Sequence, residues 1–219
     1  MSDDKLTWTV TIRDDAKFTD GEKVTAQDVA FTYQTAKESG SEIDLTMIDK
    51  ITAKDDTTIE FKLNRTYSAF MERLAYLGIV PEHAYDENFK DNPIGSGPYE
   101  FVQWDKGQQV IAKANENYYG DKPQIKQLTM VFLDTDAAYS TVQKGDVDVC
   151  QINGNLADKK VDGAKVIDID SIECYGVEFP MQKSGKKAKD GYDMGNNVTS
   201  DEAIRKALNT AVDRQKIVD

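Results

Sequence analysis

Alternating apolar and polar residues open the chain and predict an amphipathic strand. From residue 6 to residue 13 every second side chain is apolar, the period-two pattern of a strand with one buried face. The pattern breaks at two aspartates, and an Asp20-Gly21 turn follows. Thr25 then opens an amphipathic helix, with Asp28 three residues later as a weak capping box.

The same two periods continue along the chain and indicate an α/β fold. Alternation predicts strands and hairpins over residues 47–63, 99–104, 108–114 and 126–133. Apolar residues at helical spacing predict helices over 67–77, from Asp134 or Thr135 to Gly145, and from Asp201 onward. Three further strands are predicted over 147–152, 164–170 and 173–179, and the polar stretch 183–200 is predicted to be an exposed, mobile loop. A helix, a glycine and a buried strand in succession are typical of an α/β lobe.

Composition adds that the chain is acidic. Of its 219 residues 30% are charged, with 27 basic against 39 acidic side chains and a net charge of -12. This balance favours a soluble protein and argues against nucleic acid or an anionic membrane surface as a partner. No run approaches the roughly 20 apolar residues that span a bilayer.

Residues that support catalysis or metal binding are sparse. His83 is the only histidine, and together with Cys150 and Cys174 it gives no metal-ligand or hydrolase spacing. We expect both cysteines to be free and buried. A hydrolase would need a nucleophile-base pair, which the single histidine opposes.

Two further patterns are ordinary in such a chain. Asp148, Asp168 and Asp170 follow predicted strands, where carboxylates are common in an acidic protein. The turn Gly95-Ser96-Gly97 precedes a strand, so it is neither a phosphate-binding loop nor a nucleophile elbow. We therefore predict no enzyme, no cofactor and no metal site.

Six stretches of sequence, taken in order, carry more specific information than their periodicity. They are KLTWTVTIRDDAKFTDGEKVTAQDVAFTY at 5–33, VPEH at 80–83, GSGPYEF at 95–101, NENYYGDK at 115–122, TVQKGDVDV at 141–149, and the helical stretch 203–218. In this order they resemble blocks of the extracellular (periplasmic) solute-binding proteins of family 5, the substrate-binding proteins of peptide and nickel ABC transporters. The resemblance covers nearly the whole chain.

The resemblance implies a periplasmic-binding-protein type II-like lobe with a mixed β-sheet and flanking helices, plus an inserted α+β subdomain. It implies that residues 1–20 and 95–150 belong to lobe I, that 21–94 form the inserted subdomain, and that 151–219 begin a truncated lobe II. Family members carry residues before the strand at Leu6 and continue beyond Asp219. We therefore interpret the chain as an internal fragment, without the signal segment of an exported protein.

The resemblance also implies where a ligand binds. In the family, the strand that follows the crossover between lobes passes the ligand cleft, where its backbone pairs with an extended peptide. This implies ligand-binding roles for Tyr175, Val177 and Phe179, and Asn153-Gly154 is the other candidate turn at the cleft. The family usually has an asparagine after the aromatic residue of this strand. Here Pro180 stands in its place, and a proline removes a backbone donor.

The function implied is that of the substrate-binding component of an ABC importer, which captures an oligopeptide or dipeptide between two lobes and delivers it to the membrane permease. A nickel chelate, haem or an oligosaccharide on the same fold stays open as the ligand, and so does a non-transport interaction scaffold. We expect an extracytoplasmic monomer, in the periplasm or as a cell-surface lipoprotein, with no nucleic-acid partner. We also expect weak or no ligand binding by this chain alone, because half of the cleft is missing.

Overall fold

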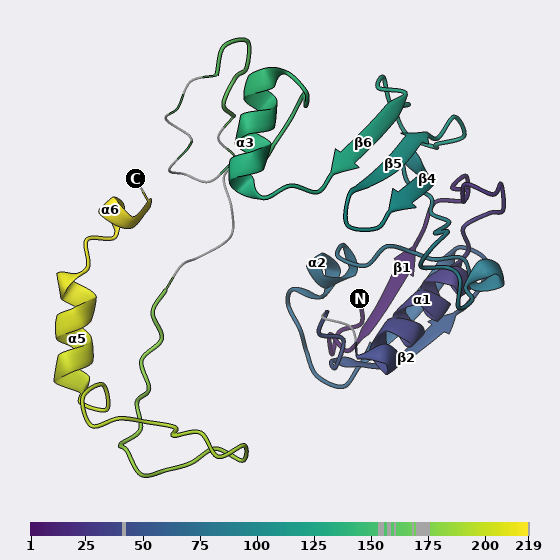
Figure 1. Cartoon of the computed structure of the whole chain (residues 1–219). Coiled ribbons are helices and arrows are strands. Elements are labelled where there is room, and N and C mark those ends of the chain that lie inside the picture. Colours follow the sequence, from purple (N-terminus) through teal and green to yellow (C-terminus); the bar gives the residue numbers. More distant parts are fainter. Residues whose placement is uncertain are drawn as a thin grey trace. The chain divides into compact units, whose positions relative to one another are not determined.

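The computed structural model describes residues 1–40, 43–152, 156, 159, 161–167, 169 and 176–218. The chain divides into two compact units, Met1–Leu133 and Asp134–Asp219. Figure 1 shows the elements in chain order. The lobe boundaries expected at residues 20, 94 and 150 remain predictions.

The first unit begins with a three-stranded antiparallel sheet. Its strands are β1 (Thr7–Thr11), β2 (Ile48–Ala53) and β3 (Thr58–Leu63), and β3 lies between the other two. The register pairs Trp8 with Phe61 and Val10 with Ile59, so the apolar residues predicted from alternation share one face. This confirms the opening strand and the hairpin predicted over residues 47–63.

Helix α1 (Ala26–Ser39) packs against β2 and β3 (Figure 1). Its capping box is present: the Thr25 hydroxyl accepts a hydrogen bond from the Asp28 N–H, and the Asp28 carboxylate accepts one from the Thr25 N–H. Between helix and sheet lies the main hydrophobic core. Its buried members are Ala26, Val29, Tyr33, Leu45, Met47, Ile48, Ile59, Phe61, Leu63 and Phe70.

Three side chains of α1 hold the segment that follows β3. This segment contains the short helix α2 (Phe70–Leu74) and the 3-10 helix η1 (Glu82–Ala84). The Tyr33 hydroxyl donates to the Leu74 carbonyl (2.6 Å), the Thr32 hydroxyl accepts from the Val80 N–H (3.0 Å), and the Asp28 carboxylate accepts from the Glu82 N–H (3.0 Å). Helix α2 is shorter than the helix predicted over 67–77, since no side chain caps its start.

A second antiparallel sheet consists of β4 (Tyr99–Asp105), β5 (Gln109–Ala114) and β6 (Gln127–Val131), in that order. One face is polar and carries the Lys113–Glu100 ion pair. The other face is apolar, with Trp104, Val110 and Met130 in one cross-strand row. Trp104 and Met130 are 41% and 51% exposed, whereas Ala112 on the same face is buried, so the face is uncovered only around these two residues within the described structure.

Two contacts tie the second sheet to the region around the first. The Thr19 N–H donates to the Gly95 carbonyl at 2.8 Å. The Arg13 guanidinium, ion-paired with Asp15, lies 4.2 Å from the centre of the Tyr119 ring. Both contacts fall inside the unit Met1–Leu133.

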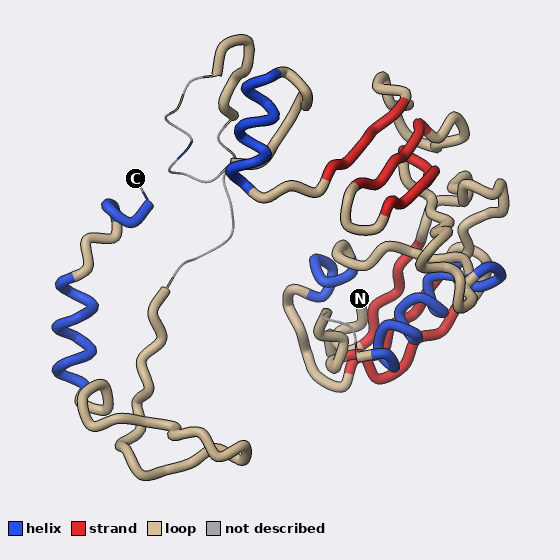
Figure 2. The backbone as a smooth tube through the Cα atoms, in the orientation of Figure 1, coloured by secondary structure: helices blue, strands red, loops and turns tan. Residues whose placement is uncertain are grey.

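The second unit contains α3 (Thr135–Lys144), α5 (Glu202–Ala211) and α6 (Gln215–Val218). Helix α3 is capped by Asp134 and ends at Gly145, whose backbone is left-handed, as predicted. Asp201 caps α5, also as predicted. Apart from Leu156, which is helical, the described residues between α3 and α5 are drawn as loop in Figure 2.

The three strands predicted between α3 and α5 are wrong for the described residues. None of residues 147–152, 164–167 and 176–179 lies in a strand. Apolar side chains that alternation would bury are exposed, such as Val149 at 88% and Ile167 at 71%. Alternation makes a segment able to form a strand, but a strand also needs a hydrogen-bonding neighbour, and the described part of this unit provides none.

Candidate functional site

The predicted ligand-binding residues fall only partly within the described structure. Asn153, Gly154 and Tyr175 lie outside the described residues. Val177 and Phe179 are in an irregular stretch, with Val177 78% exposed and Phe179 half-buried. Because the other three residues are not described, Val177 and Phe179 remain candidates.

The backbone around these two residues is open except at one end. The Pro180 carbonyl accepts a hydrogen bond from the Thr199 hydroxyl at 2.8 Å, which fixes the point where this stretch ends. No backbone hydrogen bond joins residues 176–179 to another described residue. An extended partner could pair with N–H and C=O groups of this kind.

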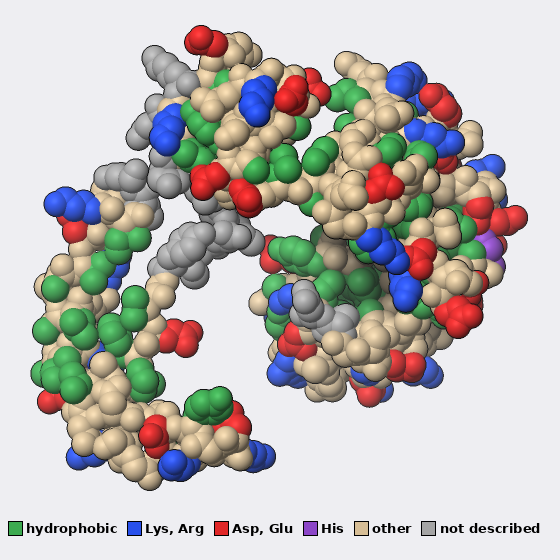
Figure 3. Space-filling model, in the orientation of Figure 1, with side chains coloured by type: hydrophobic (Ala, Val, Ile, Leu, Met, Phe, Trp, Pro, Cys, Tyr) green, Lys and Arg blue, Asp and Glu red, His purple; other side chains and the backbone are tan. Residues whose placement is uncertain are grey.

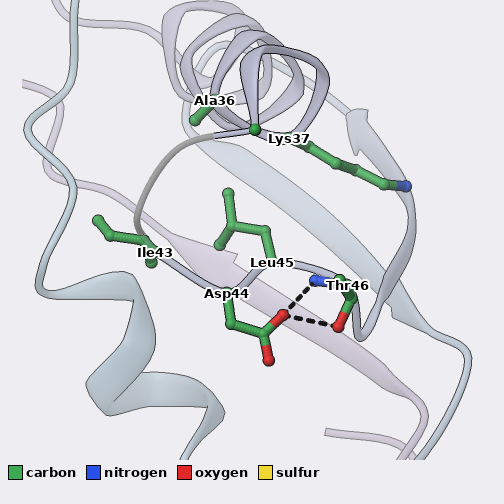
Figure 4. Close-up of a pocket in the computed structure, with 7 residues that line it drawn as sticks. Ala36, Lys37, Ile43, Asp44, Leu45 and Thr46 are labelled. Atoms are coloured by element: carbon green, nitrogen blue, oxygen red, sulfur yellow. Dashed lines mark hydrogen bonds between the residues drawn. The ribbon is translucent and has the colours of Figure 1, made fainter. Parts of the chain in front are cut away.

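A hollow that the sequence did not reveal lies at the C-terminal end of α1, with a volume of about 410 Å³ (Figure 4). It forms because α1 ends at Gly40, which has a φ of 66° and donates its N–H to the Ala36 carbonyl. The chain then returns through residues 43–46 to the start of β2. The hollow is lined by Ala36, Lys37, Gly40, Ile43, Asp44, Leu45 and Thr46.

The hollow combines a buried apolar side chain with an ionised rim. Leu45 is 3% exposed and belongs to the main core. The Asp44 carboxylate accepts hydrogen bonds from the Thr46 hydroxyl (2.6 Å) and N–H (3.0 Å), and these bonds lower the pKa of Asp44, with Arg65 and Arg73 adding smaller attractions. Lys37 extends away from the other side chains in Figure 4 and donates to the Asp49 carbonyl at 3.3 Å.

A second hollow, of about 430 Å³, lies at the same end of the first sheet. The two share this end because β1 and β2 begin where β3 finishes: Thr7 pairs with Lys62, and Ile48 pairs with Leu63. The lining residues are Met1, Lys5, Trp8, Thr66, Tyr67 and Ser68. The Trp8 indole nitrogen is buried and has no hydrogen-bond partner within the described structure. An acceptor that reached this nitrogen would satisfy it.

His83, Cys150 and the acidic side chains are described groups that could bind a metal or act in catalysis. Among the described residues, no group of three His, Cys, Asp or Glu side chains could hold a metal ion. His83 lies beside Phe18 and pairs with Asp20 at 2.8 Å. Cys150 is a half-buried free thiol, and Cys174 lies outside the described residues.

A family comparison identifies the chain. The sequence pattern of the bacterial extracellular solute-binding proteins, family 5 (middle region), matches residues 1–219. The chain belongs to this family. No helix among the described residues has the length and apolar character to cross a membrane.

Curated relatives are longer than this family 5 chain. Protein XP55 of Streptomyces lividans is 35% identical over 100% of the chain and 40% of its own length. The oligopeptide-binding protein AppA of Bacillus subtilis is 29% identical over 99% of the chain and 41% of its own length. The chain thus spans about two fifths of these relatives.

Two solved structures share its fold. NikZ of Campylobacter jejuni, in complex with Ni(L-His), matches 100% of the chain and 44% of its own chain, with a TM-score of 0.74 and 28% identity. The ABC transporter substrate-binding protein CtaP of Listeria monocytogenes matches 67% of the chain and 33% of its own, with a TM-score of 0.60 and 31% identity. The chain has the type II periplasmic-binding-protein fold, as part of a longer architecture.

Proposed function

We propose that this chain is part of the substrate-binding component of an ABC importer that captures an oligopeptide or dipeptide. The single observation that carries the proposal is the family 5 match over residues 1–219. Among the relatives is an oligopeptide-binding protein that aligns with 99% of the chain. The complete protein would work outside the cytoplasm as a monomer, would pass its ligand to permease subunits in the membrane, and would carry out no covalent chemistry.

The ligand would be held between two lobes, with its backbone paired to the stretch that includes Tyr175, Val177 and Phe179 and with Asn153-Gly154 facing it. The open backbone of residues 176–179 supports this placement. Backbone pairing gives affinity for many peptide sequences, because every residue offers the same donor and acceptor. The lobes would close on the ligand by a hinge motion.

Thermal unfolding tests the capture of peptides. We would compare this chain with a full-length protein that contains it, each in a mixture of dipeptides to pentapeptides. A ligand at a hundred times its Kd stabilises the folded state by about 2.7 kcal/mol. We expect the peptides to raise the Tm of the full-length protein and to leave the Tm of the chain alone unchanged. Saturable micromolar binding by the chain alone would contradict the expectation that half of the cleft is missing from it. An unchanged Tm in both proteins would contradict peptide capture.

A pair of variants tests the backbone role of Val177 in the full-length protein. Val177→Pro removes one N–H donor, so we expect roughly a tenfold loss of peptide affinity, the size of one hydrogen bond. Val177→Thr keeps the N–H and a β-branched shape, and it should bind as the parent does. Equal affinities in both variants, with unchanged unfolding temperatures, would remove this stretch from the site.

A nickel chelate is the second candidate ligand, because the NikZ complex with Ni(L-His) matches the whole chain. No metal-binding group of three is present among the described residues, which fits a metal that would arrive already chelated. The same thermal experiment with Ni²⁺ and L-histidine separates the two ligands. A shift with the chelate and none with peptides would replace the first proposal.

A further inference from the structure

Residues 183–200, predicted as an exposed, mobile loop, belong to a segment, 180–200, that its own hydrogen bonds close into a hairpin, which we name the lysine hairpin. At its base the Thr199 hydroxyl donates to the Pro180 carbonyl (2.8 Å), and the Asn196 N–H donates to the Gln182 carbonyl (3.0 Å). The Asn196 side chain also accepts from the Thr199 N–H (2.7 Å). The base is therefore fixed by side chains as well as by backbone.

The tip of the hairpin is a tight turn. The Ala188 N–H donates to the Tyr192 carbonyl (2.9 Å), and the Gly191 N–H donates to the Ala188 carbonyl (3.0 Å). Gly191 has a φ of 88°, which favours glycine. Lys187 and Asp193 form a backbone bridge just below the turn. Residues near the tip are thus presented in a defined arrangement.

Four lysines on this hairpin are exposed and form no ion pair within the described structure: Lys183, Lys186, Lys187 and Lys189. Five lysines elsewhere do pair with carboxylates: Lys54, Lys106, Lys113, Lys126 and Lys206. The hairpin's own acidic groups are Asp190 and Asp193. The hairpin therefore concentrates four lysines within seven residues, against two acidic side chains, in a chain that is acidic overall.

Exposed apolar side chains lie between these lysines. Met181 is 70% exposed, Tyr192 76%, Met194 44% and Val198 60%. Figure 3 shows blue basic side chains beside green hydrophobic ones on the loop that leads into α5. Lysines alone are a common solvated surface. Lysines interleaved with an exposed tyrosine and methionines suit a partner whose outer layer is anionic and whose deeper layer is apolar.

We propose that the lysine hairpin docks onto a membrane surface that contains anionic phospholipids. The ammonium groups would meet lipid phosphates, and Tyr192 and Met194 would enter the headgroup region. The acidic balance of the whole chain argues against such a partner only on average, because charges more than about 10 Å apart are screened at 0.1 M salt. The exposed apolar side chains between the lysines favour a membrane over a nucleic acid, because a headgroup region takes up both kinds of side chain. The proposal does not depend on peptide capture.

Co-sedimentation of the 219-residue chain with lipid vesicles tests the proposal. We expect binding to vesicles of phosphatidylcholine mixed with phosphatidylglycerol, and none to phosphatidylcholine alone. Binding should be lost near 1 M salt, where the screening length falls to about 3 Å. The variant K186A/K187A/K189A should lower the partition coefficient about a hundredfold, since each lysine near such a surface contributes roughly a fivefold factor.

A matched variant controls for the loss of charge. Lys50, Lys122 and Lys144 are exposed and form no ion pair within the described structure, so K50A/K122A/K144A removes the same charge from dispersed sites. It should leave the partition coefficient within about twofold. Tyr192→Ala should give a smaller loss that is independent of salt, because it removes apolar contact only.

Three outcomes would overturn the proposal. Equal binding to neutral and anionic vesicles would show that lysines do not carry it. Equal loss in the two triple variants would assign the effect to net charge. Retention on a soluble polyanion such as heparin, without binding to phosphatidylglycerol vesicles, would assign the hairpin to a non-lipid anionic partner. A failure of peptide binding would leave all of these readings unchanged.

Discussion

Asp28 joins two distant parts of the chain at the start of α1. Its carboxylate accepts hydrogen bonds from the Thr25 N–H (2.9 Å), the Thr25 hydroxyl (2.7 Å) and the Glu82 N–H (3.0 Å). The side chain is 6% exposed. One buried carboxylate thus caps a helix and also fixes the 3-10 helix that lies more than fifty residues later.

We expect Asp28→Ala to lower the free energy of unfolding by about 2 to 4 kcal/mol, because the helix loses its cap and the Thr25 and Glu82 N–H groups lose a part-buried acceptor. Asp49→Ala is the matched control. Asp49 is exposed and only its backbone carbonyl is used, by Lys37, so its loss should cost about 0.5 kcal/mol or less. Urea unfolding measures both. Similar midpoints for the two variants would show that the Asp28 bonds contribute little.

The ionisation of Tyr33 lowers the stability of the folded chain at alkaline pH. Burial of its hydroxyl raises the pKa of Tyr33 from 10.0 to about 12. Because the folded state keeps this proton longer than the unfolded chain does, the contribution to stability is complete below pH 10 and is lost as the pH rises to about 12. The two-unit shift corresponds to about 2 to 3 kcal/mol.

The measurement is the free energy of unfolding at pH 9 and again near pH 12, for the parent and for Tyr33→Phe. Phenylalanine has no proton to lose, so the difference between the two proteins should shrink by about 2 to 3 kcal/mol across this window. Tyr119, whose pKa burial also raises, is present in both proteins and cancels. A constant difference would mean that Tyr33 ionises as readily in the folded state as in the unfolded one.

At the scale of elements, a cluster of packed aromatic rings between α1 and the first sheet stabilises that sheet. Phe61 is 1% exposed, and its ring lies 5.4 Å from those of Tyr33 and Phe70. Phe132 follows β6 and is 50% exposed. Truncating each phenylalanine to alanine therefore compares the same change at a buried site and at an exposed one.

Phe61→Ala should therefore cost about 3 to 5 kcal/mol, and Phe132→Ala about 1 kcal/mol or less. Urea unfolding followed by circular dichroism gives both values. A large loss in Phe132→Ala would mean that the apolar face of the second sheet is covered in solution, for example by another copy of the chain.

Local sequence signals predict the helices and strands whose caps, turns and pairing partners lie nearby in the sequence. Strand β1, the hairpin of β2 and β3, the capping box of α1 and the glycine stop of α3 follow from alternation, caps and turns. The segments 147–152, 164–167 and 176–179 alternate as well, yet they form no strand. The difference lies in their partners: Ile59 and Phe61 have strands on both sides, whereas Val149 and Val177 have none within the described structure.

The candidate site was harder to predict than the fold. Motif resemblance indicated Val177 and Phe179, which the structure places in an open stretch. The hollow beside Leu45 was not predicted, because it arises from where α1 ends and β2 begins and from the fold of the loop between them. In sequence, Asp44 and Thr46 resemble any other polar turn.

At the scale of the whole chain, buried apolar residues are divided unevenly. Among the described residues the buried hydrophobic side chains all lie within Met1–Leu133, apart from Leu156. Both sheets are also in this unit. Residues 1–133 therefore contain what a stable fold requires, whereas the described part of the second unit has little core of its own.

We expect residues 1–133 expressed alone to fold, with a Tm close to that of the cooperative transition of the whole chain, and residues 134–219 alone to show no cooperative unfolding. Calorimetry of the three proteins measures this. A sharp transition in 134–219, or its absence in 1–133, would show that stability depends on both units.

Each sheet contains one of the chain's two tryptophans. Trp8, on β1, packs 5.4 Å from Phe70, while Trp104, on β4, is 41% exposed and lies 5.4 Å from the Lys106 ammonium. The chain therefore contains two optical reporters in different surroundings. Iodide should quench the emission of the exposed Trp104 before that of Trp8, so that tryptophan fluorescence can follow the two sheets separately.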